Sequence, residues 1–264
     1  MTESAIIAKR KKIDTQKIVG TVIVILLFAF ILYNVKWSFV RTLDFSVIYQ
    51  YWRLLLKGLS MTVLVTLVSV ITGLLSGIVL AILSQLPFRI IKILIAVHVE
   101  IWRSTPLLVQ IFWIHFALPQ ITGIPTPALV SGIIAMTLQS SAYLTEITRS
   151  GIESIPEGQW EAAKVLNLST RTTWLRVILP QALKLMLPAL CNTVLSFFKG
   201  STILSVLAIS ELVTVSNNIA SFTFRPIEII TFSGLLFFII GYGFSYLSSR
   251  LEKRLSQSSL RDPT

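Results

Sequence analysis

Long apolar runs alternate with short polar segments along most of this 264-residue chain. The runs are continuous, and they lack the strict polar–apolar alternation of a β-strand with one wet face. Each run is long enough to cross the hydrocarbon core of a bilayer, roughly 30 Å, as an α-helix. The pattern predicts six membrane-spanning helices, at residues 18–35, 59–84, 93–118, 128–148, 185–209 and 229–248.

Composition agrees with this interpretation, because 54% of the residues are hydrophobic and only 13% are charged. A soluble globular domain carries about 25% charged residues. A transmembrane β-barrel is excluded, because its strands alternate between lipid-facing and lumen-facing residues. The predicted fold class is therefore all-α, a polytopic membrane protein with about six transmembrane helices.

Basic residues produce the net charge of +11, and their distribution predicts the topology. Six spans place both termini in the cytoplasm, together with the basic clusters at residues 9–17, 89–92, 149–184 and 250–254, as the positive-inside rule expects. Four basic residues fall outside, among aromatic residues where long side chains can reach the headgroups: Lys36, Arg41, Arg53 and Lys57. The charge thus indicates cytoplasmic loops rather than a nucleic-acid partner.

The first apolar run follows a basic start, an arrangement that also occurs in signal peptides. This run is long, and Trp37, Phe39 and Val40 follow it where a signal peptide would have small residues at a cleavage site. A retained first span is therefore favoured.

Motifs that carry chemistry are few. The single cysteine, Cys191, excludes an internal disulfide, and His98 and His115 are isolated from other metal-binding residues. No zinc-site spacing, P-loop or nucleophile elbow occurs. We expect no catalytic site, metal site or cofactor in this chain, so any ATP hydrolysis has to take place in another chain.

The third predicted span contains polar residues, including Arg103, Thr105 and Gln110. Charged groups at membrane depth are costly and usually face protein or water. Pro106 in the same span lacks an N–H and frees the carbonyl of Trp102, four residues back. We therefore expect a kink at this point of the helix.

A polar island at residues 154–180 separates the fourth and fifth spans and predicts two short helices. Ser154 can cap the first helix, and Asn167 can end it because Asn tolerates the left-handed conformation. Ser169 or Thr170 can cap the second helix, which Pro180 closes. An amphipathic helix lying on the membrane surface is the alternative.

The island resembles the EAA loop of ABC importer permeases, whose pattern reads Glu-Ala-Ala, three residues, Gly, nine residues, Ile, one residue, Leu-Pro. It supplies Glu161, Ala162, Ala163, Asn167 in the Gly position, Val177 in the Ile position, Leu179 and Pro180. Both departures are mild, because Asn is the best non-Gly residue at positive φ and Val is a smaller β-branched residue. In that family the loop forms a coupling helix in a cleft of the cytoplasmic ATPase.

Two further segments resemble signatures of the polar amino-acid permeases, a branch of the same family. Residues 103–110 read Arg-Ser-Thr-Pro-Leu-Leu-Val-Gln against the signature Arg-Gly-Thr-Pro-Leu-Leu-Val-Gln. Residues 139–146 read Gln-Ser-Ser-Ala-Tyr-Leu-Thr-Glu against Asn-Ser-Gly-Ala-Tyr-Leu-x-Glu. Because three separated signatures occur in the family order, the resemblance is specific, and it covers about residues 58–254.

The resemblance implies a five-helix type I ABC importer permease core at residues 58–254. An extra N-terminal helix in residues 1–57 precedes this core, and a cytoplasmic tail at residues 255–264 follows it. The implied location is the bacterial cytoplasmic (inner) membrane. The expected partners are a second permease chain, identical or homologous, two ABC ATPase subunits that bind ATP and Mg²⁺, and a substrate-binding protein.

A zwitterionic amino-acid substrate needs a cationic or N–H-rich partner for its carboxylate and an anion for its ammonium. Glu211 matches the acidic position of the family's Ala-Glu-Leu pattern and is expected to receive the ammonium, with an ion pair to Lys199 as the alternative. The other candidates for substrate contact are Lys199, Ser201, Thr105, Gln110, Gln139 and Ser140. Each could instead make a helix–helix hydrogen bond.

Three functions remain to be separated. The first is an ABC amino-acid permease, and the second is the same architecture importing another small zwitterion or cation, such as a compatible solute or an opine. The third is an ion-driven secondary transporter or channel without an ATPase partner. The EAA loop argues strongly against the third, whereas no residue separates the first two.

Overall fold

The computed structural model describes residues 3–260, with side chains placed for residues 17–253, and this part of the chain is helical throughout its regular structure. The chain divides into two compact units, Met1–Asp44 and Phe45–Thr264. The predicted N-terminal region, residues 1–57, thus includes the first turns of the helix that begins at Ser46. Residues 1–2 and 261–264, the ends of the two predicted tails, lie outside the described range.

The first unit consists of a long helix and one short turn. Helix α1 spans Glu3–Asn34 and α2 spans Trp37–Val40. The window Lys17–Asn34 is apolar and long enough to cross a membrane, and none of it is buried within the structure. The first predicted span is therefore confirmed as a helix with apolar side chains suited to contact lipid.

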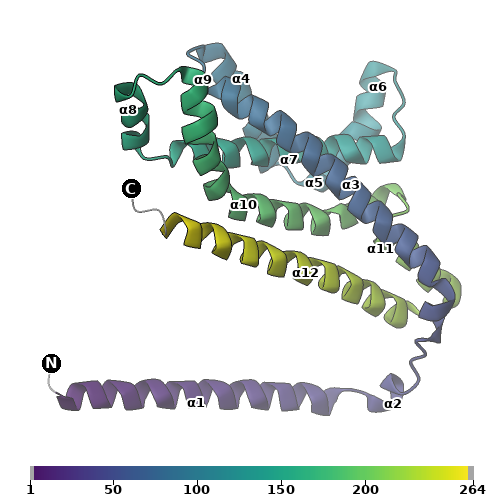
Figure 1. Cartoon of the computed structure of the whole chain (residues 1–264). Coiled ribbons are helices and arrows are strands. Elements are labelled where there is room, and N and C mark those ends of the chain that lie inside the picture. The colour runs from purple at the N-terminus through teal and green to yellow at the C-terminus, as the bar shows by residue number, and fades with distance from the viewer. Residues whose placement is uncertain (1–2, 261–264) are drawn as a thin grey trace. The chain divides into compact units, whose positions relative to one another are not determined.

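Four long helices form the frame of the second unit: α3 (Ser46–Ser84), α7 (Ala128–Glu153), α10 (Leu179–Gly200) and α12 (Pro226–Leu260). Helix α7 packs against α3 and α10, and α12 packs against α10 and α11 (Leu212–Thr223) (Figure 1). Together with α1, these helices give five segments of the described chain that are long and apolar enough to span a membrane.

The third predicted span is the exception, because it is broken into pieces. Helix α4 (Arg89–Ser104) ends before Thr105 and Pro106, and α5 (Leu107–Phe112) follows. A π-helical turn at Trp113–Ala117 and the short α6 (Leu118–Thr122) complete the segment. Sequence analysis predicted a kink, and the structure shows a full interruption of the helix.

The interruption has a local cause. Thr105 is extended, at φ −99° and ψ 141°, as the residue before a proline prefers. Because Pro106 has no N–H, the carbonyl of Trp102 lacks its helical partner, and the side chain of Gln110 donates to it instead, at 2.9 Å. The same amide nitrogen also bonds the carbonyl and the hydroxyl of Thr105, at 3.0 and 2.8 Å. Gln110 thus holds the break together.

Helices α3 and α7 are in close contact at the centre of the second unit. A Cβ atom added at Gly73 would lie 1.8 Å from Oγ of Ser140, and one added at Gly77 would lie 2.9 Å from the backbone nitrogen of Thr145. Ser140 donates a hydrogen bond to the carbonyl of Ser69 at 2.8 Å. Small residues at these positions therefore permit the two helices to pack in contact.

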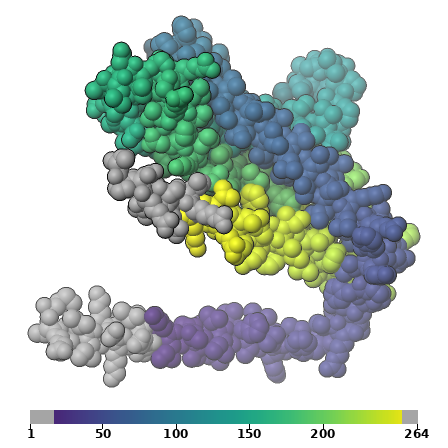
Figure 2. Space-filling model, viewed as in Figure 1, coloured from purple at the N-terminus to yellow at the C-terminus, as the bar shows by residue number. Residues whose placement is uncertain are grey.

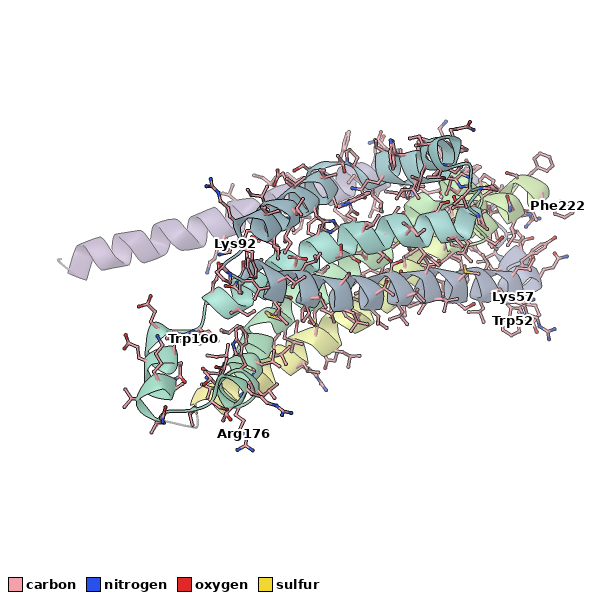
Figure 3. The ribbon with its side chains drawn as sticks, turned by 90° about the horizontal axis from the view of Figure 1, so that it is seen from above. Trp52, Lys57, Lys92, Trp160, Arg176 and Phe222 are labelled. Carbon is pink, nitrogen blue, oxygen red and sulfur yellow. The ribbon has the colours of Figure 1, made fainter. Side chains whose placement is uncertain are left out.

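Two groups of residues mark opposite ends of this unit. Lys92, Trp160 and Arg176 lie at one end, and Trp52, Lys57 and Phe222 lie at the other (Figure 3). The segments that sequence analysis placed on the cytoplasmic side thus lie together, away from those that it placed outside.

The two isolated histidines each contact a serine of α7. His98 lies 2.9 Å from the hydroxyl of Ser141, and His115 lies 3.0 Å from that of Ser131, in keeping with a packing role.

Candidate substrate pocket and coupling segment

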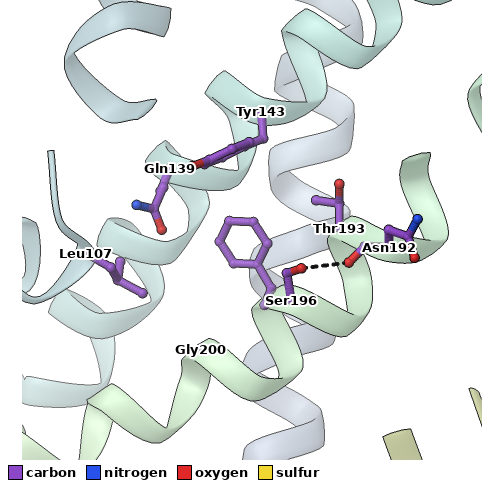
Figure 4. Close-up of a pocket in the computed structure, with 8 residues that line it drawn as sticks. Leu107, Gln139, Tyr143, Asn192, Thr193, Ser196 and Gly200 are labelled. Atoms are coloured by element: carbon purple, nitrogen blue, oxygen red, sulfur yellow. Dashed lines mark hydrogen bonds between the residues drawn. The ribbon is translucent and has the colours of Figure 1, made fainter. Parts of the chain in front are cut away.

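A cavity of about 300 Å³ lies between α5, α7 and α10, and we call it the α7–α10 pocket. A volume near 300 Å³ is at the lower end of the range for small-molecule sites. Figure 4 shows Gln139 and Tyr143 on α7 and Thr193 and Ser196 on α10, with the Asn192 side chain directed away from α7. The residues that line the pocket are Leu107, Gln139, Tyr143, Asn192, Thr193, Ser196, Phe197 and Gly200.

The polar groups of this pocket differ in how far their hydrogen-bonding capacity is used. Ser196 donates to the carbonyl of Asn192 at 2.9 Å (Figure 4), and Thr193 donates to the carbonyl of Ala189 at 2.8 Å. Their hydroxyl oxygens remain able to accept. Within the described residues, the side-chain amides of Gln139 and Asn192 have no hydrogen-bond partner. The pocket therefore offers both donors and acceptors to a polar ligand.

The residues that line the pocket carry no formal charge, but the side chain of Arg103 lies beside one of them. The Tyr143 and Phe197 rings meet edge to face, with centroids 6.3 Å apart. The guanidinium of Arg103 lies 5.5 Å from the centroid of the Tyr143 ring, close enough for a cation–π interaction. One helical turn after Tyr143, Glu146 pairs with Arg149, which also binds Glu153 at 2.8 Å.

Of the residues predicted to contact substrate, Gln139 alone lines this pocket. Thr105 and Gln110 bond each other at the helix break, and Ser140 is buried against α3. Ser201 is buried and donates to the carbonyl of Phe198 at 2.8 Å, and Lys199 is exposed. Sequence analysis did not single out Asn192, Thr193 and Ser196, although three polar residues within five positions of an apolar helix were a usable signal.

Glu211 occupies a different environment from the one expected. Its side chain is fully buried and caps the N-terminus of α11. The carboxylate accepts the backbone N–H groups of Val213 at 2.9 Å and Thr214 at 2.7 Å, and the hydroxyl of Thr62 at 3.4 Å. Lys199 is not among its partners in the described structure. This geometry gives Glu211 an internal capping role, because its acceptor positions are filled by the protein.

Of the two short helices predicted in the EAA segment, residues 154–180, the first is present, although its cap differs from the prediction. The second does not end at Pro180 as predicted, because the helix that begins at Thr170 continues through a π-helical stretch into α10, where Pro180 lies in the first turn and needs no N–H partner. Helix α8 spans Glu157–Val165 with Pro156 at its N-cap. Ser154 instead follows the end of α7 and donates to the carbonyl of Gly151 at 2.9 Å. Helix α9 (Thr170–Thr172) begins after Ser169, whose hydroxyl accepts the N–H of Thr172 at 3.2 Å, as predicted.

The turn after α8 confirms the left-handed conformation predicted for Asn167, whose φ is 51°. The N–H of Asn167 bonds the carbonyl of Lys164 at 2.9 Å, and the N–H of Leu168 bonds that of Ala163 at 3.0 Å. These two bonds form a Schellman motif, which satisfies carbonyls at the end of the helix. The turn therefore fixes the direction of the chain as it leaves α8.

The EAA segment presents one face of α8 outward. Trp160 packs edge to face on Trp174, with centroids 5.5 Å apart, and Ala163 is buried. The exposed residues of α8 and its C-terminal end are Glu161, Ala162, Lys164, Val165 and Leu166, and Leu179 and Pro180 are exposed further along the chain. Val165 is 85% and Leu166 69% exposed. In the space-filling view, this green segment forms a lobe at the surface (Figure 2).

Comparisons with known proteins extend this picture. The arginine transport system permease protein ArtQ of Bacillus subtilis is 30% identical over 82% of this chain and 99% of its own length. The L-cystine transport system permease protein TcyB of the same organism is 32% identical over 79% of this chain and 89% of its own length.

Solved structures match most of the chain as well. An amino acid ABC transporter, crystallised with histidines, superposes with a TM-score of 0.76 and 36% identity over 81% of this chain and 99% of that chain. The MetNI methionine ABC transporter shares the fold, with a TM-score of 0.66 at 19% identity over 78% of this chain and 98% of that chain.

The family description that matches residues 73–257 is "Binding-protein-dependent transport system inner membrane component". This range includes the α7–α10 pocket, the EAA segment and most of α12. Family membership implies ATPase partners and a substrate-binding protein. The chain is a multi-pass membrane protein and a transport subunit rather than an enzyme. It belongs to the inner-membrane permeases of binding-protein-dependent ABC importers.

Proposed function

We propose that this chain is the permease subunit that carries a polar amino acid across the bacterial cytoplasmic membrane. The observation that carries this proposal is the α7–α10 pocket. Within the described residues, the side-chain amides of Gln139 and Asn192 have no hydrogen-bond partner there, and the rings of Tyr143 and Phe197 form part of the same wall. Relatives named for arginine, cystine and glutamine transport support the substrate class. A compatible solute or an opine is the alternative cargo for the same architecture.

The pocket suits a zwitterion of modest size. The two amides and the hydroxyl oxygens of Thr193 and Ser196 can bond the polar groups of an amino acid. Arg103, held over the Tyr143 ring of the pocket wall, provides a cation for the carboxylate. Glu211 and Gln110 do not bind the substrate in this proposal. Glu211 stabilises the N-terminus of α11, and Gln110 stabilises the C-terminus of α4.

Transport needs partners that contribute the energy and the second half of the path. Two ATPase subunits bind ATP and Mg²⁺, and a second permease chain, identical or homologous, completes the membrane domain. A substrate-binding protein delivers the amino acid from outside, and both termini of the permease lie in the cytoplasm. Helix α8 inserts its exposed face into the ATPase, so that closure of the nucleotide sites moves the helices and switches access between the two sides.

Uptake by the reconstituted complex tests this assignment. Permease, ATPase and binding protein are assembled in proteoliposomes, and uptake of labelled arginine, glutamine, cystine and glycine betaine is compared. Gln139→Leu and Asn192→Leu should each reduce amino-acid uptake by about three- to tenfold, because each removes hydrogen bonds worth about 1 kcal/mol. The control Asn218→Leu replaces an exposed amide on α11 and should leave uptake unchanged.

Two outcomes would contradict the proposal. Unchanged amino-acid uptake in both pocket variants would remove the α7–α10 pocket from the transport path. Uptake of glycine betaine with no uptake of any amino acid would replace the substrate class with the alternative one.

A further inference from the structure

A second cavity, of about 170 Å³, lies between α10 and α12, and we call it the α10–α12 groove. Its lining is rich in polar side chains, although both helices are largely apolar. Those that matter to the argument are Cys191, Asn192, Ser245, Ser248, Ser249 and Glu252. No part of the transport path described above uses this groove, apart from the residue that it shares with the first pocket.

Asn192 lines both cavities. Successive residues of an α-helix are rotated by about 100°, so residues 193, 196, 197 and 200 of α10 lie on one face and residues 188, 191 and 195 lie on the next. Asn192 lies at the border between these faces. The groove therefore lies next to the α7–α10 pocket, on the neighbouring face of α10. Along α10 it is shifted by about one helical turn toward the N-terminal end of the helix, which follows the EAA segment.

The groove contains an acidic group, which the first pocket lacks. Ser248 donates to one carboxylate oxygen of Glu252 at 3.1 Å. Among the side chains that the structure describes, no other donor bonds this carboxylate, and Arg250 lies over the Tyr246 ring, 4.5 Å from its centroid. A half-buried carboxylate with one hydrogen bond, in a groove that hydroxyls and an amide also line, is suited to bind a cation.

The cation that fits is organic. Within the described residues, no cluster of three or more His, Cys, Asp or Glu side chains could hold a metal ion. The space equals the volume of about five or six waters, which is enough for a cationic head group and some water. An ammonium or guanidinium group can bond Glu252, the serine hydroxyls and Asn192 together.

We propose that the α10–α12 groove is a second binding site on the path of the cargo, where Glu252 receives the ammonium or guanidinium group of an amino acid. This inference rests on the proposed function, which places both termini in the cytoplasm. In that topology the groove lies on the cytoplasmic side of the membrane. The substrate passes Asn192 from the uncharged pocket to the acidic groove before it leaves.

Cys191 provides a reporter for this site, because it lines the groove and is the only cysteine of the chain. The rate at which N-ethylmaleimide alkylates Cys191 is measured in the complete transporter by mass spectrometry of the peptide that contains it. Millimolar L-arginine should slow the reaction severalfold. N-acetyl-L-glutamine, which is of similar size but has no cationic group, should not.

Two variants locate the effect. Glu252→Gln should abolish the protection by L-arginine, measured as the ratio of rates with and without the ligand. Lys253→Gln changes one charge at the exposed neighbouring position and should retain the protection.

Several results would overturn the inference. Absence of protection in the wild-type complex would do so, and so would equal protection in Glu252→Gln. Dissociation of the Glu252→Gln complex into subunits on size exclusion would assign the carboxylate to an interface instead. ATP-driven uptake is measured in the same preparation: intact uptake with an unprotected Cys191 removes the groove alone, whereas absence of amino-acid uptake removes the proposed function itself.

Discussion

At the scale of single residues, Glu211 has internal hydrogen-bond partners that the sequence did not predict. It was a candidate to receive the substrate ammonium, because an acidic residue near a membrane span suggests a cationic partner. Its partners are two backbone N–H groups and two hydroxyls, supplied by α11 and by Thr62 of α3. The distant partner, Thr62, could not be read from the sequence, because only the fold brings it near.

Replacement of Glu211 by Gln separates capping from substrate binding. The amide oxygen can accept one of the backbone N–H groups, but the NH₂ group faces the other donor, so α11 loses a charge-assisted bond. We expect a loss of about 1–3 kcal/mol in stability, seen as a lower Tm of the detergent-solubilised complex. Uptake per assembled complex should stay close to wild type. A stable complex that has lost uptake would instead place Glu211 on the substrate.

Asn167 gives a second prediction at this scale. Its φ of 51° suits Gly and Asn, but it is unfavourable for a β-branched residue by about 1–2 kcal/mol. Asn167→Val should therefore distort the end of α8 and weaken capture of the ATPase in a pull-down assay, whereas Asn167→Gly should bind as wild type does. Equal binding by the Val variant would show that the turn does not position α8.

At the scale of elements, hydrophobic pattern was sufficient to predict most helices but not their partners. The long spans at α3, α7, α10 and α12 are present, because continuous apolar runs of this length leave little alternative in a bilayer. Helix α11, which lies between the fifth and sixth predicted spans, was not predicted. Its stability depends on the Glu211 cap and on Ser216, which bonds Ser233 of α12 at 2.6 Å. The α10 side of the α7–α10 pocket was also not predicted, although its polar residues Asn192, Thr193 and Ser196 stand out in the sequence of an apolar helix.

Contact between α3 and α7 makes a sharp prediction. Gly73→Ala would place a methyl group within 1.8 Å of Ser140 Oγ and 3.0 Å of the backbone nitrogen of Ser141, so the helices have to separate. Overpacking of this kind costs about 1–3 kcal/mol, and we expect a lower Tm and a lower yield of complex. Gly234→Ala on α12 has no atom within 4 Å and is the matched control. Equal Tm values for both variants would contradict the close packing.

For the whole molecule, the central claim is that ATP hydrolysis in partner subunits drives amino-acid uptake through this chain. The EAA segment lies at the end of the second unit opposite Trp52 and Phe222. Its outward face combines the carboxylate of Glu161 with the apolar side chains of Val165 and Leu166. The sequence predicted the turns at Asn167 and Ser169, because these depend on local residues, but not the cap of α8 or the continuation of the helix past Pro180.

The most direct test measures ATP-driven uptake in proteoliposomes that contain the complete transporter, with wild-type permease and with Glu161→Lys. Wild-type complex should accumulate the amino acid only when ATP is hydrolysed and the binding protein is present. Glu161→Lys should lose uptake although the membrane domain still folds, because the reversed charge repels a basic group expected on the ATPase. Accumulation driven by an ion gradient without the ATPase subunits, or full ATP-dependent uptake by Glu161→Lys, would contradict this account.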